Sequence, residues 1–259
     1  MSLVTTTAAG PLVTIELNRP EARNALSLEL CDAIVEALDE VGKHDAARVI
    51  VLAGAGPVFC SGADFAAVSG PEGVDFLPAF ERMLEAVGDH RLPTVARIQG
   101  AALGGGLQLA TVCDFRIATS DARLGIPSSR LGVVVNLENV ERLVDLVGIA
   151  RAKEVLMTGA TFSGDDAVGA GLVSEVCAPR ELERATERMA GAIAALAPLS
   201  VQGAKRAIRA ITVERSVRKN NPEAALEVDA LVAEAYASGD LGEGIRAMTE
   251  KRPPDFKGL

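Results

Sequence analysis

The chain has 259 residues, of which 49% are hydrophobic, and this is enough to fill the core of one large domain or of a domain with an appendage. A formal net charge of −9 argues against nucleic acid as a general partner, and 3% aromatic residues without any Trp make a base-stacking surface unexpected. A polyanionic small ligand stays open if a few Lys and Arg side chains converge locally.

The sequence contains no apolar run near the roughly 18 residues that a membrane span needs. Residues 1–17 also lack the basic, then apolar, then small-residue order of a signal peptide, so we expect a cytoplasmic protein. The cysteines are widely spaced in apolar surroundings, without a CxxC pair, which predicts reduced core thiols and no metal centre. They are Cys31, Cys60, Cys113 and Cys177.

The first two-thirds of the chain alternates short apolar runs with helical patterns, which indicates an α/β fold. Leu12–Leu17 reads as a strand, and Ser27 is a good N-cap for the helix that follows. The apolar face of that helix has three-to-four spacing and consists of Leu30, Ile34, Leu38 and Val41. Arg48–Leu52 is predicted to be a buried strand closed by a glycine-proline turn at residues 54–57.

Turn-forming residues in Ser69–Val74 predict a mobile loop, after which Phe76–Val87 returns to helix. A strand at Thr94–Ile98 leads through a glycine-rich stretch into Leu107–Cys113, a helix that is apolar almost all round and must be buried. Asp114–Ala118 is again predicted to be a strand, and Val140–Val147 and Ala150–Met157 are predicted to be helices. Ser163 and Asp166 form a capping box before Ala167–Gly171. The stretch Leu172–Val176 closes this α/β part.

Beyond Pro179 only helical patterns occur, which suggests an appended subdomain or an oligomerisation layer. The predicted helices are Glu181–Leu196, Ser200–Thr212, Pro222–Ala237 and Leu241–Thr249. Strand and helix units recur about every 40 residues, a spacing that suits a coiled stack of ββα turns as well as a doubly wound sheet. Periodicity alone leaves both architectures open.

Four segments, in order and with matching spacing, resemble motifs of the crotonase (enoyl-CoA hydratase/isomerase) superfamily. They are Asn18–Leu26, Gly56–Asp64, Gln99–Gly106 and Glu250–Lys257, and the similarity covers nearly the whole chain. The resemblance implies an α/β coiled stack of ββα units, with an acyl-CoA site in a core of residues 1–197. Residues 198–259 would then be a helical trimerisation region, in a homotrimer or a dimer of trimers.

Chemistry on a thioester needs two fixed backbone N–H groups aimed at the acyl oxygen, and small residues that let the ligand approach. The resemblance implies that Ala63 and Gly105 supply these groups. Glycines at 104–106 could instead serve only close packing of a helix on a strand. The accompanying segment Cys60–Asp64 favours the catalytic interpretation.

The resemblance also places coenzyme A. Backbone around Arg23–Ala25 and Ser61–Ala63 would hold the adenine, and the side chain of Arg23 would face the phosphates. Phe256 and Lys257 resemble tail residues that close over the coenzyme, often from a neighbouring subunit. For Arg23 and Lys257 the alternative is an ordinary solvated surface charge.

Two positions depart from the hydratase pattern. Where hydratases carry their two glutamates this chain has Gln108 and Ser128, and neither side chain has a pKa usable for general acid–base work near neutrality. Ordinary hydration should therefore be slow or absent.

Other polar residues near these motifs have simpler explanations. Asn136 stands where some isomerases and a dehalogenase carry a catalytic Asp, but it also fits a helix N-cap. Glu138 could be a replacement base if it points into the acyl pocket, although a glutamate in a first helical turn is favoured in any case. Asp64 is expected to be structural. His44 and His90 lie in no recognisable triad or metal spacing, and both are expected to be exposed.

The sequence therefore predicts an enzyme acting on acyl-CoA thioesters, with coenzyme A as part of the substrate and with no permanently bound cofactor or metal. The alternative is a non-catalytic acyl-CoA binding protein that retains the same pocket. No nucleic acid or membrane partner is expected.

Overall fold

The computed structural model describes residues 2–64 and 73–258. It divides into two compact units. Unit 1 consists of Met1–Leu124 and Phe162–Arg209, and unit 2 of Gly125–Thr161 and Ala210–Leu259. This division differs from the one predicted at residue 198, because residues 125–161 group with the C-terminal helices and residues 198–209 group with the main sheet.

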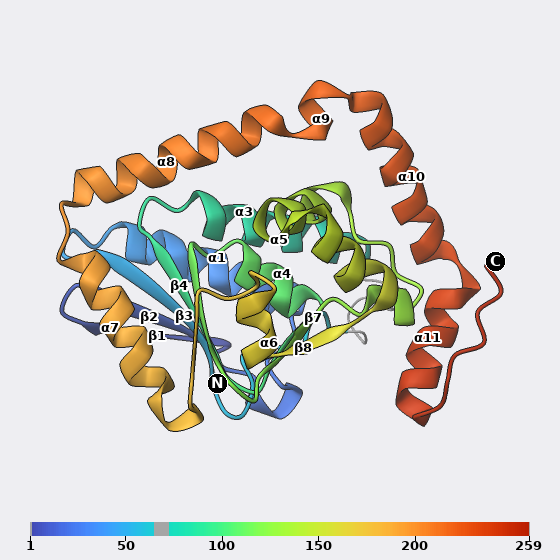
Figure 1. Cartoon of the computed structure of the whole chain (residues 1–259), viewed down its shortest axis with the longest axis horizontal. Helices are drawn as coiled ribbons and strands as arrows, with labels where there is room; N and C mark the ends of the chain where they lie inside the picture. The colour runs from blue at the N-terminus through green and yellow to red at the C-terminus, as the bar shows by residue number, and fades with distance from the viewer. Residues whose placement is uncertain (1, 65–72, 259) are drawn as a thin grey trace. The chain divides into compact units, whose positions relative to one another are not determined.

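The main sheet has six strands in the order β1-β2-β3-β4-β6-β9 (Figure 1). They are β1 (Val4–Ala9), β2 (Leu12–Leu17), β3 (Val49–Gly54), β4 (Thr94–Ile98), β6 (Phe115–Thr119) and β9 (Glu175–Cys177). The first two form an antiparallel hairpin, and every later pair in the order is parallel. Burial of all six residues of β3 fits a central parallel strand, which is covered on both faces.

A second sheet has the order β5-β7-β8, with strands Ala101–Leu103, Arg123–Gly125 and Thr161–Ser163. Along the chain β4 is followed by β5, and β6 by β7, so successive turns place one strand in each sheet. A doubly wound fold would keep all its parallel strands in one sheet. Of the two architectures left open by the sequence, the structure therefore has the coiled stack of ββα turns.

The helices follow the predicted order. They are α1 (Leu28–Gly42), α3 (Gly73–Asp89), α4 (Gly105–Thr111), α5 (Leu137–Thr158), α6 (Gly164–Gly169), α7 (Leu182–Ala194), α8 (Pro198–Arg215), α9 (Val217–Asn220), α10 (Pro222–Ala237) and α11 (Gly239–Glu250), with short 3-10 turns at Pro20–Ala22, Ser128–Arg130 and Pro179–Glu181. The hydroxyl of Ser27 accepts a hydrogen bond from the Leu30 N–H, which confirms it as the N-cap of α1. All four apolar positions predicted for α1 are buried.

One face of the main sheet packs against α7, which lies across the strands in Figure 1. The apolar cluster at this contact comprises Val49, Val51, Val95, Ile117, Leu182, Ala185 and Ala190. Because side chains alternate along a strand, the neighbours of these strand residues point to the opposite face. Arg116, next to Ile117, is one of them.

Several predicted boundaries need correction. The closing stretch predicted at Leu172–Val176 contains the start of β9, which begins at Glu175, while Leu172 and Ser174 bind the side chain and backbone of Arg116. The interruption predicted after Val147 is confirmed, since Gly148 has φ +74 inside α5. Of the loop expected at Ser69–Val74, residues 69–72 lie outside the described residues, and Gly73 begins α3.

All four cysteines are free thiols, and only Cys177 is not fully buried. Burial raises the pKa of the Cys31, Cys60 and Cys113 thiols to about 12. Among residues 2–64 and 73–258 no helix is both long and apolar enough to cross a membrane.

Both histidines were predicted to be exposed, and the structure confirms this for only one of them. His44 is exposed, but His90 is half-buried, and its Nδ1 accepts a hydrogen bond from the Leu92 N–H at 3.1 Å. The prediction for His90 was wrong because the turn that contains it packs beside α1, where the ring approaches Gly42.

Candidate active site

The loop before α1 is held in place by a buried asparagine. Arg23 and Asn24 both have left-handed backbone, with φ 52 and φ 54. The amide of Asn24 donates to the carbonyls of Ala55 and Val58, both at 2.9 Å, and its oxygen accepts from the Arg19 N–H at 3.0 Å. Asn24 thereby fixes residues 19–25 against the turn that follows β3.

The backbone of Leu26 pairs with the segment after Cys60. Leu26 N–H donates to the Gly62 carbonyl, and the Asp64 N–H donates to the Leu26 carbonyl, both at 2.8 Å. This is a parallel bridge between Leu26 and Ala63 in which Leu26 makes both bonds. The N–H of Ala63 therefore points away from Leu26.

Glycines bring this segment against the start of α4. Gly62 has φ +110, and a Cβ there would lie 2.9 Å from the Leu103 oxygen and 3.6 Å from the Gly105 nitrogen. At Gly106 a Cβ would lie 2.4 Å from the Cys60 oxygen. Any side chain at either position would force the two backbones apart. The glycine motif thus serves close packing, and the same packing brings the two backbone segments together.

The amide of Gly105 is the first in α4, where no intrahelical acceptor exists. Neither this amide nor that of Ala63 donates a hydrogen bond to another described residue. Backbone N–H groups without an acceptor in the described chain are available to donate to a ligand oxygen.

Gln108 lies one turn further along α4 and is 9% exposed. Its backbone carbonyl accepts from the hydroxyl of Thr111 at 2.7 Å, whereas its side-chain amide hydrogen-bonds no described residue. The amide can therefore bind a water or a ligand oxygen, but it cannot act as a base.

The two segments expected to hold adenine are joined directly, since Ser61 N–H donates to the Arg23 carbonyl at 3.1 Å. Ala25 is buried, whereas the side chain of Arg23 is exposed and pairs with no described carboxylate. Arg23 is thus available to an anionic ligand.

Asp64 has the structural role that the sequence suggested. Its carboxylate pairs with the Arg19 guanidinium at 3.1 Å, and Arg19 also donates to the Ala25 carbonyl at 2.8 Å. This ion pair ties the two segments together beside the bridge between Leu26 and Ala63.

The remaining predicted site residues belong to unit 2. Ser128 begins a 3-10 turn and is half-buried. Asn136 accepts from the Asn139 N–H at 3.2 Å, which confirms it as the N-cap of α5. The Glu138 carboxylate is paired with Arg218, whose guanidinium also binds both oxygens of Asp229 at 2.8 and 2.9 Å.

The C-terminal tail lies along α11. The N–H groups of Lys257 and Gly258 donate to the two carboxylate oxygens of Asp240, at 2.7 and 2.9 Å. The ammonium of Lys257 pairs with Asp255 at 2.7 Å, and Phe256 is 37% exposed. Phe256 and Lys257 are therefore both accessible to solvent in this chain.

Sequence reasoning overlooked Asn24, whose amide joins two segments of the site. A signal was present, because Asn is one of the few residues that adopts left-handed backbone readily, and it stands here inside a short loop before a helix N-cap.

Nearly the whole chain matches a known protein family. The model of the family described as enoyl-CoA hydratase/isomerase matches residues 7–259. The chain belongs to this family. The crotonase fold predicted from the sequence is thereby confirmed, together with the α/β class and the C-terminal helical region.

Relatives cover nearly the full length of the chain. A probable enoyl-CoA hydratase echA6 of Mycobacterium leprae is 36% identical over 256 residues, which are 97% of this chain and 98% of that protein. A crotonyl-CoA hydratase of Syntrophomonas wolfei is 32% identical over 252 residues, 95% of this chain and 94% of the other. Among solved structures, a methylmalonyl-CoA decarboxylase in complex with 2-nitronate-propionyl-CoA has a TM-score of 0.89 at 26% identity and 99% coverage of both chains.

Proposed function

We propose that this protein is an enzyme that binds acyl-CoA thioesters and polarises the thioester carbonyl through the N–H groups of Ala63 and Gly105. One observation carries the proposal. The segments that carry these two amides are in close contact at Gly62 and Gly106, and neither amide has an acceptor among residues 2–64 and 73–258. Fixed donors of this kind stabilise charge that develops on an acyl oxygen.

Coenzyme A would lie beside this pair. The joined segments Arg23–Ala25 and Ser61–Ala63 would receive the adenine, and the unpaired Arg23 guanidinium would face the phosphates. Phe256 and Lys257 would close over the coenzyme from the tail of the same or a neighbouring copy, in a homotrimer or a dimer of trimers.

The chemistry would depend on stabilised negative charge on the acyl oxygen rather than on a glutamate pair. Gln108 and Ser128 occupy the positions of the hydratase glutamates, so hydration should be weak. Isomerisation, hydrolysis and decarboxylation each develop negative charge on the acyl oxygen, and the two amides would stabilise that charge. Decarboxylation of a 2-carboxyacyl-CoA generates an enolate without prior proton abstraction, and a decarboxylase is among the structural relatives.

Glu138 remains the candidate for a replacement base, although its carboxylate is already paired with Arg218. If it is a base, Glu138→Gln should abolish the activity that a substrate panel reveals. Glu141→Gln is a matched control, since Glu141 lies one turn further along α5 and binds the Ser216 hydroxyl at 3.1 Å. Equal effects of the two changes would assign Glu138 a structural role.

The test combines binding and turnover. Calorimetry with acetyl-CoA and a medium-chain acyl-CoA should detect binding, and a panel of acyl-CoAs followed by mass spectrometry should reveal the reaction. Absence of heat and of any thermal shift at millimolar ligand would refute the assignment. Binding without any turnover would favour the non-catalytic alternative, which the enzyme names of the relatives do not favour.

A further inference from the structure

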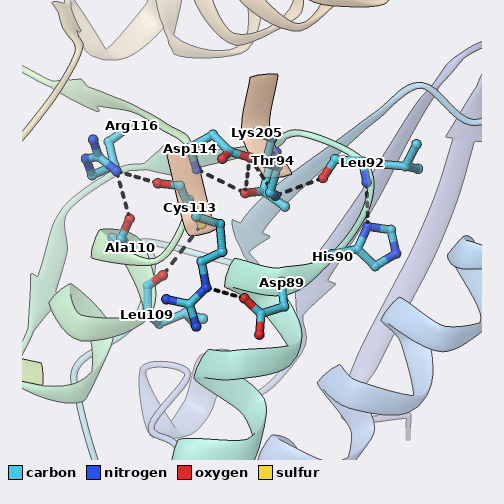
Figure 2. A network of polar contacts seen from close by, with 11 residues as sticks. Asp89, His90, Leu92, Thr94, Leu109, Ala110, Cys113, Asp114, Arg116 and Lys205 are labelled. Atoms are coloured by element: carbon cyan, nitrogen blue, oxygen red, sulfur yellow. Dashed lines mark hydrogen bonds and ion pairs between the residues drawn. The ribbon is translucent and has the colours of Figure 1, made fainter. Parts of the chain in front are cut away.

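Arg116 is a buried cation in β6, the strand between β4 and β9 of the main sheet. It is 6% exposed, and its guanidinium contacts three backbone carbonyls. Nε donates to Leu172 at 3.0 Å, while Nη1 donates to Cys113 at 2.5 Å and more weakly to Ala110 at 3.4 Å. Figure 2 shows the contacts with Ala110 and Cys113 at the end of α4.

Burial of a guanidinium is costly unless its donors are satisfied. Arg116 pairs with no carboxylate among the described residues. The nearby Asp114 is instead bonded to the Lys205 ammonium at 2.8 Å and to Thr94. The charge of Arg116 is therefore met by the carbonyls of Ala110 and Cys113, at and just beyond the carboxyl end of α4, where the helix dipole places partial negative charge.

The length of α4 makes these contacts important. It has seven residues, and a helix this short does not hold its own position in water. Besides the burial of its apolar side chains, a contact near each end locates it. Near its start Gly106 lies against Cys60, and Arg116 binds Ala110 in its last turn and Cys113 just beyond its end.

The other side of Arg116 is anchored firmly. Its N–H donates to the Ser174 hydroxyl, and its carbonyl accepts from the Ser174 N–H at 2.8 Å. Its strand β6 is paired with β4 and β9 on either side. Arg116 thus links α4 to β6 and to the segment that leads into β9.

We propose that Arg116 is the positioning residue of the oxyanion pair, because its guanidinium fixes the carboxyl end of α4 and thereby the Gly105 N–H at the other end. The inference rests on the proposed function of Ala63 and Gly105. Arg116 is not a catalytic residue, since it reaches the ligand only through α4. A displacement of about 1 Å at such a donor is enough to cost roughly 10²-fold in rate.

The adjacent residue provides a matched control. Ile117 points to the opposite face of β6, into the cluster under α7. Ile117→Ala should destabilise the protein by leaving a cavity in this cluster, which contains no residue of α4. Arg116→Met removes the guanidinium. Arg116→Lys keeps the positive charge but replaces the planar guanidinium, which has several N–H donors in fixed directions, with a compact ammonium group.

The experiment uses the full-length protein and crotonyl-CoA labelled with ¹³C at the thioester carbonyl. Infrared difference spectra report how far the bound carbonyl stretch shifts from its frequency in water. We expect a shift in the wild type that is mostly lost in Arg116→Met, partly retained in Arg116→Lys and fully retained in Ile117→Ala. The dissociation constant of coenzyme A itself should stay unchanged, and kcat for any substrate found should fall by about 10²-fold while KM changes little.

Four outcomes would count against these roles. A wild-type spectrum without any shift would refute the polarisation by Ala63 and Gly105, and the role of Arg116 with it. A normal wild-type shift that both Arg116 variants retain would overturn the role of Arg116 alone. That role is also overturned if Ile117→Ala loses the shift equally, or if even Arg116→Lys cannot fold.

Discussion

Glycine at position 106 sets how closely α4 approaches the segment that carries Ala63. Gly106→Ala would place a methyl group 2.4 Å from the Cys60 oxygen and 2.9 Å from its Cβ, and backbone must move to relieve this. We expect a loss of about 1–3 kcal/mol in the free energy of unfolding, together with weaker polarisation of a bound thioester. Urea unfolding and the carbonyl spectrum measure the two effects.

The control for this substitution lies in α8. Gly203 has nothing within 4 Å of its added Cβ, so Gly203→Ala should stabilise the protein by about 0.5–1 kcal/mol through its helix propensity. Equal stability of the two variants would contradict the close contact between α4 and Cys60.

The side chain of Asn24 makes three hydrogen bonds while fully buried. Asn24→Ala should lower the free energy of unfolding by about 1–3 kcal/mol, because it leaves two carbonyls and one N–H in a partly buried loop without their partners. It should also weaken coenzyme A binding by releasing the loop. Asn220→Ala is the matched control, since the Asn220 amide also donates to two carbonyls but is exposed. This change should lower the free energy of unfolding far less. Urea unfolding and calorimetry would show the contrast.

Gln108 and Ser128 carry an amide and a hydroxyl in place of carboxylates, and this should limit the rate of crotonyl-CoA hydration. Gln108→Glu combined with Ser128→Glu should raise crotonyl-CoA hydration at least about 10²-fold over the wild type, since one acid–base group is commonly worth that much. Each single change should do much less, because one glutamate cannot both orient the water and deliver a proton to the α-carbon.

A control for the added charges is Gln202→Glu with Ser129→Glu, which makes the same chemical changes elsewhere in the chain. Spectrophotometric assay of all variants gives the comparison. Robust hydration by the unmodified protein that survives Glu138→Gln would defeat this explanation, because the proton transfers would then use an unrecognised group.

At the scale of elements, Lys205 attaches α8 to the start of β4. Its ammonium donates to the Leu92 carbonyl at 3.0 Å and to Asp114 at 2.8 Å, and His90 lies in the same turn (Figure 2). Burial lowers the pKa of His90 from its ordinary value of 6.5, and the charge of Lys205 acts in the same direction. The imidazole is thus held neutral in the folded protein as Nδ1 accepts from Leu92.

The sign of the pH dependence follows from this shift. As the pH falls below about 6.5 the unfolded chain binds a proton at His90 before the folded chain does, so the free energy of unfolding decreases until the folded pKa is reached. His90→Gln should remove this part of the pH dependence. Urea unfolding between about pH 5 and pH 8 measures it. The exposed His44 gives the control His44→Gln, which should keep the wild-type slope, and an unchanged slope in His90→Gln would contradict the prediction.

The elements also show what a sequence can predict. The helix after Ser27 was placed correctly because both its cap and its apolar spacing are local signals. β1 was missed because five of its six residues are exposed at a sheet edge, where no alternation appears. β5, β7 and β8 are three residues each, too short for a period. The backbone motifs pointed to the two segments that meet at Gly62, whereas the roles of Asn24 and Arg116 depend on distant carbonyls that no local pattern specifies.

At the scale of the whole molecule, large apolar side chains are exposed mainly on the C-terminal helices. Leu199 is 85% exposed, Ile208 64% and Leu226 65%, and Ile211 and Leu231 are also above half. Single exposed residues are ordinary, but α8 and α10 each carry several, as expected of helices that contact another copy. We therefore predict a trimer or hexamer assembled through these helices.

Light scattering at micromolar concentration tests this assembly, and a mass near the 26.8 kDa of one chain would contradict it. Ile208→Asp with Ile211→Asp should shift the population towards the single chain, because burying two carboxylates in an apolar contact is costly without partners. Val168→Asp changes an exposed apolar residue of α6 and should leave the mass unchanged. If the tail that carries Phe256 and Lys257 closes over the coenzyme of a neighbouring copy, the double variant should also lose coenzyme A affinity while the Val168 variant keeps it. Loss of assembly with full retention of affinity would assign the tail to the site of its own chain.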